Sequence, residues 1–332
     1  MKNSIAIALL SVFIFQGCAP KIEKEQSFHG EAQGTTYSIK YIGEEQKDLK
    51  QTIDSLLKAV DASMSTWVPT SKISQLNTSM AIQIDPMFKS VFELSRKINQ
   101  ASQGAFDPSI GPVIEAWGFD YTNPITLDSN TIDSLLLICG MNQFQLKEDS
   151  IIKLNPKSKL NFNAIAQGYS VDLMAVELEK LGIERYFIEL GGEVLVRGKN
   201  KQNEWWRVGI DKPEGRNLNR ALSAIVNLEN RAMVTSGNYR SFVEVDGKKY
   251  SHSLNPKTGR PVKHNLLSAT IFAPTAAEAD AWATACMVMG LEKAIQLIES
   301  SVQLDAVFIF DQEGSLKTYI SEGIKSRTEE TN

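Results

Sequence analysis

The chain has 332 residues, 42% of them hydrophobic, and carries 35 Lys and Arg against 39 Asp and Glu, a formal net charge of −4 at pH 7. These values exclude a disordered, a collagen-like and a disulfide-stapled protein, and they argue against nucleic acid as a main partner. Because only 3 His and 3 Cys are present, a metal site in this chain is expected to use oxygen ligands.

The N-terminus carries a short apolar run. Residues 5–15 read IAIALLSVFIF, which is too short to span a membrane and predicts that residues 1–17 are a secretory signal peptide. Gly17 before Cys18 resembles the lipobox of bacterial lipoproteins, in which the cysteine is acylated and becomes the first residue of the mature chain. An ordinary cleaved signal beside a coincidental cysteine is the alternative.

The remainder reads as one folded unit. The polar residues 18–27 are predicted to be a tether, residues 28–325 the folded domain, and residues 326–332 a disordered tail. No linker, repeat or low-complexity block divides the domain. Cys139 and Cys286 lie among apolar neighbours, which predicts small buried thiols and neither a disulfide nor a nucleophile.

Hydrophobic patterning predicts both helices and strands in the domain. Helical spacing indicates helices over residues 48–63, from Phe88 onward, over 165–181 before Gly182, and over 275–289 before Gly290. Alternation indicates strands over residues 37–42, 186–190, 222–228, 267–273 and 304–310, and a hairpin formed by 242–245 and 248–251 around Asp246-Gly247. Hairpins mixed with long helices, without a regular βαβ alternation, predict an α+β fold.

One candidate for chemistry lies on the Ala-rich helix over residues 275–289. Asp280 and Thr284 are four residues apart, so their oxygens share a face and suit a hard cation such as Mg²⁺. The flanking alanines are expected to leave this surface small enough for a bulky group to approach. The alternative is a solvated helix face.

Turn-rich segments are the other candidates. Residues 251–261 carry Lys257 and Arg260 beside Gly259 and suit a phosphate or pyrophosphate, although a plain surface turn explains them equally well. Residues 235–238 are interpreted as a second such loop. The rings of residues 105–119 either stack on a flat heterocycle or fill the core. No common nucleotide-binding or hydrolase motif occurs.

In order, these segments resemble the ApbE family of flavin transferases, from about Gly34 to Phe310. The motifs that carry the resemblance are Gly34-Thr35-Thr36-Tyr37; Met64-Ser65-Thr66-Trp67 with Ser71, Ile73, Ser74 and Asn77; Ala105-Phe106-Asp107 through Gly111-Pro112 to Trp117-Gly118-Phe119; Asn163-Ala164-Ile165-Ala166-Gln167-Gly168-Tyr169 with Asp172; Gly191-Gly192-Glu193; Thr235 to Arg240; His252 with Asn255 to Gly259; and Ala279 to Thr284. A lipoprotein signal is also typical of this family in bacteria.

The resemblance implies a T-fold-like arrangement of antiparallel sheets packed with helices. It implies an FAD:protein FMN transferase, which uses FAD and Mg²⁺, transfers FMN to a Thr or Ser hydroxyl of a target flavoprotein and releases AMP. It further implies a lipid-anchored protein on the periplasmic side of the inner membrane. Its acceptors would be proteins such as subunits of sodium-pumping NADH:quinone oxidoreductase.

The resemblance also assigns residues. It implies a metal held by the side chains of Asp280 and Thr284 and by the backbone carbonyl of Ala164, and a flavin pocket formed by Gln33, Trp67, Ala105, Phe106, Asp107 and Gln167. It places His252 beside the flavin and phosphate region, as a positioning group or a general base. His252 and Asp280 are the expected catalytic residues.

This chain departs from the family at two positions, because Gln167 and Asn255 stand where Lys and Asp are frequent. Two alternative functions share the same site: an FAD pyrophosphatase that gives FMN and AMP with water as the acceptor, and a lipoprotein that binds FAD without catalysis. If no flavin binds, the remaining hypothesis is a surface lipoprotein with a purely structural role.

Overall fold

A computed structural model describes residues 24–119, 127–213, 221–237, 242–245, 248–251 and 253–331. The helices are α1 (Leu49–Met64), α2 (Lys72–Thr78), α3 (Pro86–Ala101), α4 (Gly111–Ala116), α5 (Ser129–Leu136), α6 (Ala166–Lys180), α7 (Ala276–Met289), α8 (Leu291–Ser300) and α9 (Glu322–Lys325), with a 3₁₀ turn at Met141–Gln143. The predicted signal peptide and Cys18 lie outside the described residues.

The strands are β1 (Glu25–Ala32), β2 (Thr35–Ile42), β3 (Ala81–Gln83), β4 (Phe144–Lys147), β5 (Ser150–Lys153), β6 (Tyr186–Leu190), β7 (Glu193–Arg197), β8 (Trp206–Asp211), β9 (Leu222–Leu228), β10 (Arg231–Gly237), β11 (Phe242–Val245), β12 (Lys248–Ser251), β13 (Leu254–Asn255), β14 (Arg260–Pro261), β15 (Leu266–Ala273), β16 (Asp305–Gln312), β17 (Ser315–Ile320) and β18 (Thr328–Glu330).

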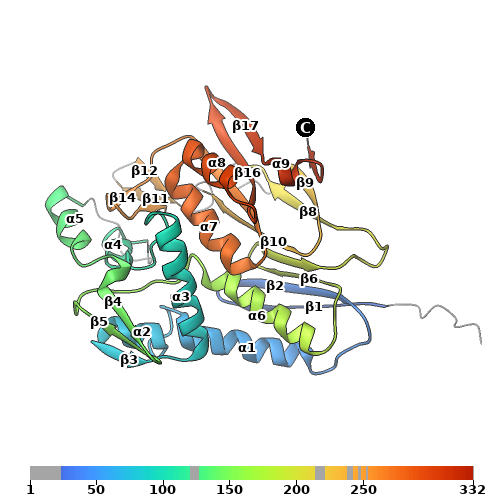
Figure 1. Ribbon diagram of the computed structural model, residues 1–332, viewed down its shortest axis with the longest axis horizontal. Helices are drawn as coiled ribbons and strands as arrows, with labels where there is room; N and C mark the ends of the chain where they lie inside the picture. Colours follow the sequence, from blue (N-terminus) through green and yellow to red (C-terminus); the bar gives the residue numbers. More distant parts are fainter. Residues whose placement is uncertain are drawn as a thin grey trace, which may run out of the picture.

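An antiparallel sheet of eight strands organises the molecule, in the order β1-β2-β6-β7-β10-β15-β16-β17. Small sheets of two or three strands surround it, and the paired strands throughout the described chain run antiparallel. Helices and hairpins are interspersed along the chain, and the described residues form no parallel βαβ core (Figure 1). The predicted α+β fold is confirmed.

Helices α1, α6, α7 and α8 cover one face of the large sheet. Figure 1 shows α6 and α7 in front of it, and residues of all four helices share one hydrophobic core with β2, β6, β10, β15 and β16. The other face of the sheet packs on β8 and β9. A separate lobe, formed by α2, α3 and β3 to β5, packs on α7 from the side away from the sheet.

Helix α7 lies between two cores. Ala276, Ala279 and Ala283 face the sheet, whereas Ala281 and Ala285 face the lobe formed by α2, α3 and β3 to β5, and all five are fully buried. The expectation that these alanines leave room for a bulky ligand is therefore wrong. Their small side chains let protein pack closely on both sides of the helix.

Two tight turns lie at the same end of the sheet. The β1–β2 turn is Gln33-Gly34, and the β6–β7 turn is Gly191-Gly192, with positive φ at all four residues. Because Tyr37 of β2 pairs with Leu190 of β6, the two turns are neighbours. The hairpin geometry, which favours glycine and asparagine at positive φ, thus brings distant segments together.

The ends of the described chain are more ordered than expected. Strand β1 begins at Glu25, inside the predicted tether over residues 18–27. The predicted disordered tail over 326–332 contributes β18, which pairs with β9. Both segments form main-chain hydrogen bonds with a neighbouring strand, which the hydrophobic pattern of the segments themselves does not predict. None of the described helices is long and apolar enough to cross a membrane.

Three further sequence predictions are settled by the fold. Residues Thr235 to Gly237 end the central strand β10, so the loop predicted there is wrong for these residues. Cys139 and Cys286 are free thiols, as predicted, although Cys139 is only partly buried. Burial raises the pKa of each thiol to about 12, which keeps both protonated and unreactive.

Candidate active site

The first turn of α6 lies directly against α7. The carboxylate of Asp280, on α7, accepts a hydrogen bond of 3.2 Å from the backbone N–H of Gly168. A Cβ at position 168 would overlap the carbonyl of Ala276 and lie 2.9 Å from the Cα of Ala277. Only glycine therefore lets the helices approach closely enough for Asp280 to reach the start of α6.

The two helices cap each other. The carboxylate of Asp172, on α6, accepts hydrogen bonds from the backbone N–H groups of Ala276 (2.7 Å) and Ala277 (2.9 Å). These first-turn amides have no partner inside α7, and a carboxylate at a helix N-terminus also interacts favourably with the helix dipole. Asp172 and Asp280 thus hold α6 and α7 together through reciprocal contacts.

Three carboxylates interact around this helix pair. Burial raises the pKa of Asp280 far above its usual range, and the negative charges of Glu193 and Asp172 raise it further. Burial also raises the pKa of Asp172 to about 7, against the opposing effect of its two amide hydrogen bonds. A bound cation would relieve this repulsion.

The oxygen atoms predicted to bind a metal beside Asp280 suit a hard cation. Most ligands of such a cation would come from groups other than acidic side chains. In the described part of the chain, no group of three His, Cys, Asp or Glu residues has a metal-binding arrangement. Thr284 lies one helical turn beyond Asp280 and is partly exposed, and Ala164 lies in the turn that leads into α6. Carboxylate, hydroxyl, carbonyl and substrate oxygens together suit Mg²⁺.

The tight turns at the end of the sheet lie against α6. The side-chain Nε2 of Gln33 donates to the hydroxyl of Ser170 at 2.8 Å, and the side-chain Oε1 of Gln33 is buried without a hydrogen-bond partner among the described residues. A Cβ at Gly191 would lie 3.1 Å from Oε2 of Glu193 and 3.3 Å from Nε2 of Gln167. The structure therefore brings Gln33, Gln167 and Glu193 to the beginning of α6.

A second group of predicted residues gathers around the loop after α3. Oδ1 of Asp107 accepts from the backbone N–H (2.8 Å) and hydroxyl (2.5 Å) of Ser109, and burial raises the pKa of this carboxyl. The side chain of Lys257 passes close to Gly104, with its Cε 3.9 Å from the Cβ position there. The loop over residues 253–261 thus lies beside the predicted flavin residues Ala105 to Asp107.

Two aromatic side chains of this region are core residues. The ring of Phe106 is 1% exposed and packs with Ile165 and Ala281, and Trp117 is 4% exposed and donates from its indole N–H to the carbonyl of Gly259 at 2.8 Å. Both rings fill the core in this structure, in line with the second of the two alternatives for this segment. By contrast, Trp67 follows α1 and is 58% exposed.

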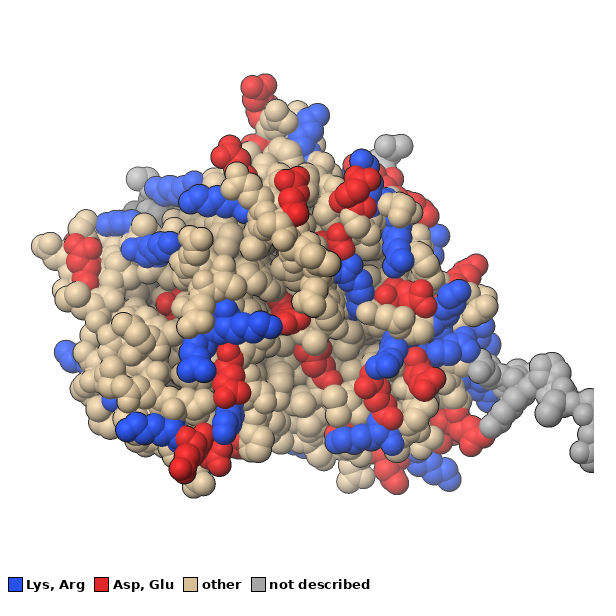
Figure 2. All heavy atoms as spheres, viewed as in Figure 1, with Lys and Arg blue, Asp and Glu red and all other residues tan. Residues whose placement is uncertain are grey.

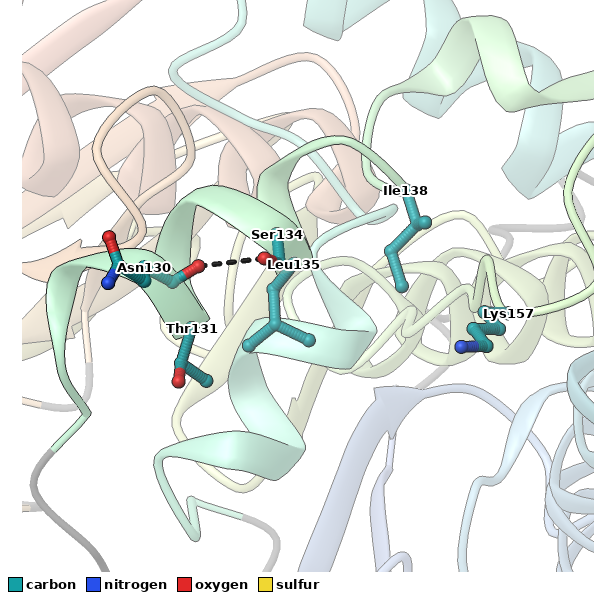
Figure 3. Close-up of a pocket in the computed structure, with 6 residues that line it drawn as sticks. All are labelled: Asn130, Thr131, Ser134, Leu135, Ile138 and Lys157. Carbon is teal, nitrogen blue, oxygen red and sulfur yellow. Dashed lines mark hydrogen bonds between the residues drawn. The ribbon is translucent and has the colours of Figure 1, made fainter.

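Two surface depressions are lined by residues other than the predicted site residues. One, of about 420 Å³, lies on α5, where Asn130 and Ser134 are hydrogen bonded (Figure 3); it is lined by Asn130, Thr131, Ser134, Leu135, Ile138 and Lys157. The other, of about 380 Å³, lies between β1 and α1. Charges of both signs are interspersed over the face seen in Figure 2, in agreement with the balanced composition.

The ApbE family model matches residues 33–308, most of the described chain. The chain belongs to the ApbE family. Because curated members of the family are transferases, the predicted enzyme class is confirmed along with the family itself.

Relatives of this ApbE-family chain match it over nearly their whole length. Curated proteins named FAD:protein FMN transferase are 31% identical in Vibrio cholerae (98% of both chains) and 33% identical in Escherichia coli K12 (96% of both chains). The solved flavin transferase ApbE of Vibrio cholerae has a TM-score of 0.82 at 30% identity, covering 92% of this chain and 99% of that one. The flavinyl transferase ApbE of Pseudomonas stutzeri has a TM-score of 0.83 at 28% identity, covering 92% and 97%.

Two residues of this site were not singled out by sequence reasoning. Asp172 and Glu193 entered only as parts of ApbE-family motifs, yet Asp172 caps α7 and Glu193 acts on the charge of Asp280. The glycines Gly191 and Gly192 also entered only as part of such a motif, yet a Cβ at Gly191 would lie 3.3 Å from Nε2 of Gln167. His252, the remaining predicted catalytic residue, lies outside the described residues.

Replacing Asp172 with Ala is expected to lower the free energy of unfolding by about 1–2 kcal/mol, because two buried first-turn amides of α7 lose their acceptor. Urea denaturation monitored by circular dichroism measures the change. Glu177→Ala is the matched control on the same helix, since among the described residues Glu177 pairs with the exposed ammonium of Lys180 and its loss should cost less than about 0.5 kcal/mol. Equal losses in the two variants would contradict the capping role.

Proposed function

We propose that this chain transfers FMN from FAD to the hydroxyl of a Thr or Ser side chain of a target flavoprotein and releases AMP, with Mg²⁺ at the Asp280 carboxylate. The main support is the match, over 96–98% of this chain, to relatives named FAD:protein FMN transferase. The buried, mutually repelling carboxylates at the α6–α7 contact supply the local chemistry that a cation-assisted phosphoryl transfer needs.

The reaction exchanges the phosphoanhydride bond of FAD for a phosphoester bond to the acceptor. The acceptor oxygen forms a bond to the phosphorus of the FMN moiety, the pyrophosphate bond breaks, AMP leaves with the bridging oxygen, and the hydroxyl proton goes to a base. Mg²⁺, when bound, neutralises the charge of the pyrophosphate and polarises it. Because the nucleophile comes from the partner, the enzyme is required to position groups and stabilise charge.

The residues of this chain take the following roles in the proposal. Asp280 supplies a buried carboxylate to the cation, with Thr284 and the carbonyl of Ala164 completing the protein ligands. The flavin pocket draws on Gln33, Trp67, Ala105 to Asp107 and Gln167. Since the ring of Phe106 is buried in the core, Phe106 contributes to the shape of this pocket and not to stacking. His252 positions the phosphate region or accepts the hydroxyl proton.

The transferase activity is tested by incubating the purified protein with FAD, Mg²⁺ and a candidate acceptor, such as the flavin-free form of a subunit of a sodium-pumping NADH:quinone oxidoreductase. Mass spectrometry should find one added FMN group on an acceptor Thr or Ser. No adduct should form in the presence of a chelator or when that Thr or Ser is replaced by Ala. Formation of FMN and AMP without an adduct would favour the pyrophosphatase instead. Binding of FAD without any turnover would favour the non-catalytic lipoprotein.

The location of the protein is part of the proposal. The apolar run over residues 5–15 and the Gly17-Cys18 pair support acylation of Cys18 and anchoring on the periplasmic face of the inner membrane. Labelling of cells with a radioactive fatty acid should mark the wild-type protein and not Cys18→Ser. Equal labelling of both would contradict the anchor.

A further inference from the structure

A buried lysine lies at the end of β5, outside the residues assigned to the site. Lys153 is 1% exposed, and its ammonium donates to the backbone carbonyls of Asn77 (3.2 Å), Pro156 (2.8 Å) and Ser158 (3.0 Å). An ammonium group has three N–H donors, so all of them are used. These bonds tie β5 to the end of α2 and to the turn over residues 155–158.

The charge of Lys153 is balanced by carbonyl dipoles alone. Among the described residues, its ammonium contacts no carboxylate. Burial, together with the nearby charge of Lys159, lowers the pKa of Lys153. A buried lysine without a counter-ion is costly, and an apolar side chain would fill the same space more cheaply if packing were its only role.

The groups held by Lys153 lead directly to the candidate site. The side chain of Asn77 binds Leu160 twice, donating to its carbonyl (2.9 Å) and accepting from its N–H (2.8 Å). The next residue, Asn161, donates its backbone N–H to the carbonyl of Pro108 (2.8 Å). Residues 158–161 are thus held between the end of α2 and the loop that carries Asp107.

The same segment continues into the start of α6. The carbonyl of Phe162 accepts from the backbone N–H groups of Ile165 (3.0 Å) and Ala166 (2.9 Å), which encloses Ala164 in a turn. Two residues after Ala166, the N–H of Gly168 binds the carboxylate of Asp280. Residues 158–168 therefore link the carbonyls around Lys153 to the candidate site. They include Ala164, and their backbone hydrogen bonds reach the loop of Asp107 and the carboxylate of Asp280.

We propose that Lys153 is a positioning residue: its ammonium fixes residues 156–162 and thereby sets the flavin loop at Asp107 and the carbonyl of Ala164 relative to Asp280. The proposal rests on the proposed function, because it concerns how the FAD and Mg²⁺ groups of that site are held. Lys153 itself touches neither the substrate nor the cation in this scheme.

Lys153→Met tests the proposal, since Met has a similar length and no donor. We expect the FAD and Mg²⁺ concentrations that give half-saturation to rise about tenfold, as outer-shell replacements around metal sites do, in protein that remains folded at the assay temperature. FAD binding is followed by quenching of flavin fluorescence, which needs no acceptor protein. Lys157→Met, on the same turn with an exposed ammonium, is the matched control and should behave as wild type.

Asn77→Ala removes the two bonds to Leu160 and leaves the ammonium in place. It should produce the same shift in half-saturation, and the double variant should shift no further than the larger single one, because the two residues act on one segment. If Lys153→Met does not fold, Asn77→Ala decides the question. Hydrogen exchange should show faster exchange of the amides of Leu160, Asn161, Ile165 and Ala166 in both variants.

The outcomes separate the two proposals. If the wild-type protein binds FAD but forms no FMN adduct, the proposed function is contradicted. The change in half-saturating FAD concentration between wild type and the variants can still be measured in that case. Variants that melt at a lower temperature yet keep wild-type half-saturation for FAD and Mg²⁺ show that Lys153 is only a structural residue, which overturns the inference.

Discussion

Asp280→Asn is expected to reduce FMN transfer by about 100-fold or more while leaving the protein folded. Asn retains an oxygen that accepts the hydrogen bond from the N–H of Gly168, but it lacks the negative charge that the proposed cation requires. The variant is measured by mass spectrometry of the acceptor under saturating FAD and by calorimetric titration with Mg²⁺, whose affinity should fall in parallel.

The stability of Asp280→Asn should change in the opposite direction to its activity. Because the pKa of Asp280 in the folded protein lies above its unfolded value, the ionised carboxylate at neutral pH opposes folding. Without Mg²⁺, the free energy of unfolding of Asp280→Asn should therefore equal or exceed that of wild type. Added Mg²⁺ should raise the melting temperature of wild type only.

Glu278→Gln is the control for the Asp280 prediction. Glu278 lies on the same helix, in its first turn, and its carboxylate is 3.6 Å from the ammonium of Lys97. Loss of this charge should change transfer less than about threefold, since the pair is largely a surface interaction. If Asp280→Asn transfers FMN within threefold of wild type, Asp280 does not hold the cation.

Gly168→Ala is expected to destabilise the protein by about 3 kcal/mol and to abolish most of the FMN transfer. The added methyl group would overlap the backbone of Ala276 and Ala277, and backbone atoms in a buried helix contact cannot move aside as a flexible side chain does. Separation of α6 from α7 would also remove Asp280 from the first turn of α6. Guanidinium denaturation and the FMN-transfer assay measure the two effects.

Gly43→Ala is the matched control for Gly168→Ala. A Cβ at Gly43 meets nothing closer than 3.9 Å, and Gly43 does not have a positive φ. The same substitution there should be neutral or slightly stabilising, because Ala restricts the unfolded chain more than Gly does. A loss at Gly168 no larger than the change at Gly43 would show that the close helix contact is not needed.

Long elements with a strong pattern were predicted well from the sequence. The helix expected over residues 48–63 is α1 (Leu49–Met64), and the helix over 275–289 is α7 with Thr275 as its N-cap. The strands expected over 186–190 and 222–228 are β6 and β9 with the same bounds. In each case the apolar periodicity extends over enough residues to distinguish helix from strand.

Short elements were missed for a related reason. Helix α2 has 7 residues and strand β3 has 3, so each is shorter than the stretch over which hydrophobic periodicity identifies an element of its type. Strand β10 was hidden because it ends in Thr-Ser-Gly, residues that favour turns when no partner strand is present. In the sheet, pairing of residues 235–237 with β15 overrides that preference, whereas β7 pairs only with residues 231–233.

The sequence by itself determined the α+β class, the long elements, the family resemblance and the scarcity of His and Cys that directs attention to oxygen ligands. Only the tertiary structure decided that the alanines of α7 pack against other parts of the protein and that Asp172 and Asp280 cap opposing helices. It also decided that the buried ammonium of Lys153 donates to backbone carbonyls. Hydrophobic periodicity is a property of neighbouring residues, so it can be recognised in the sequence alone. Charge coupling, close backbone approach and burial depend on segments more than 100 residues apart, as Gly168 and Asp280 are, and these contacts exist only once the chain has folded.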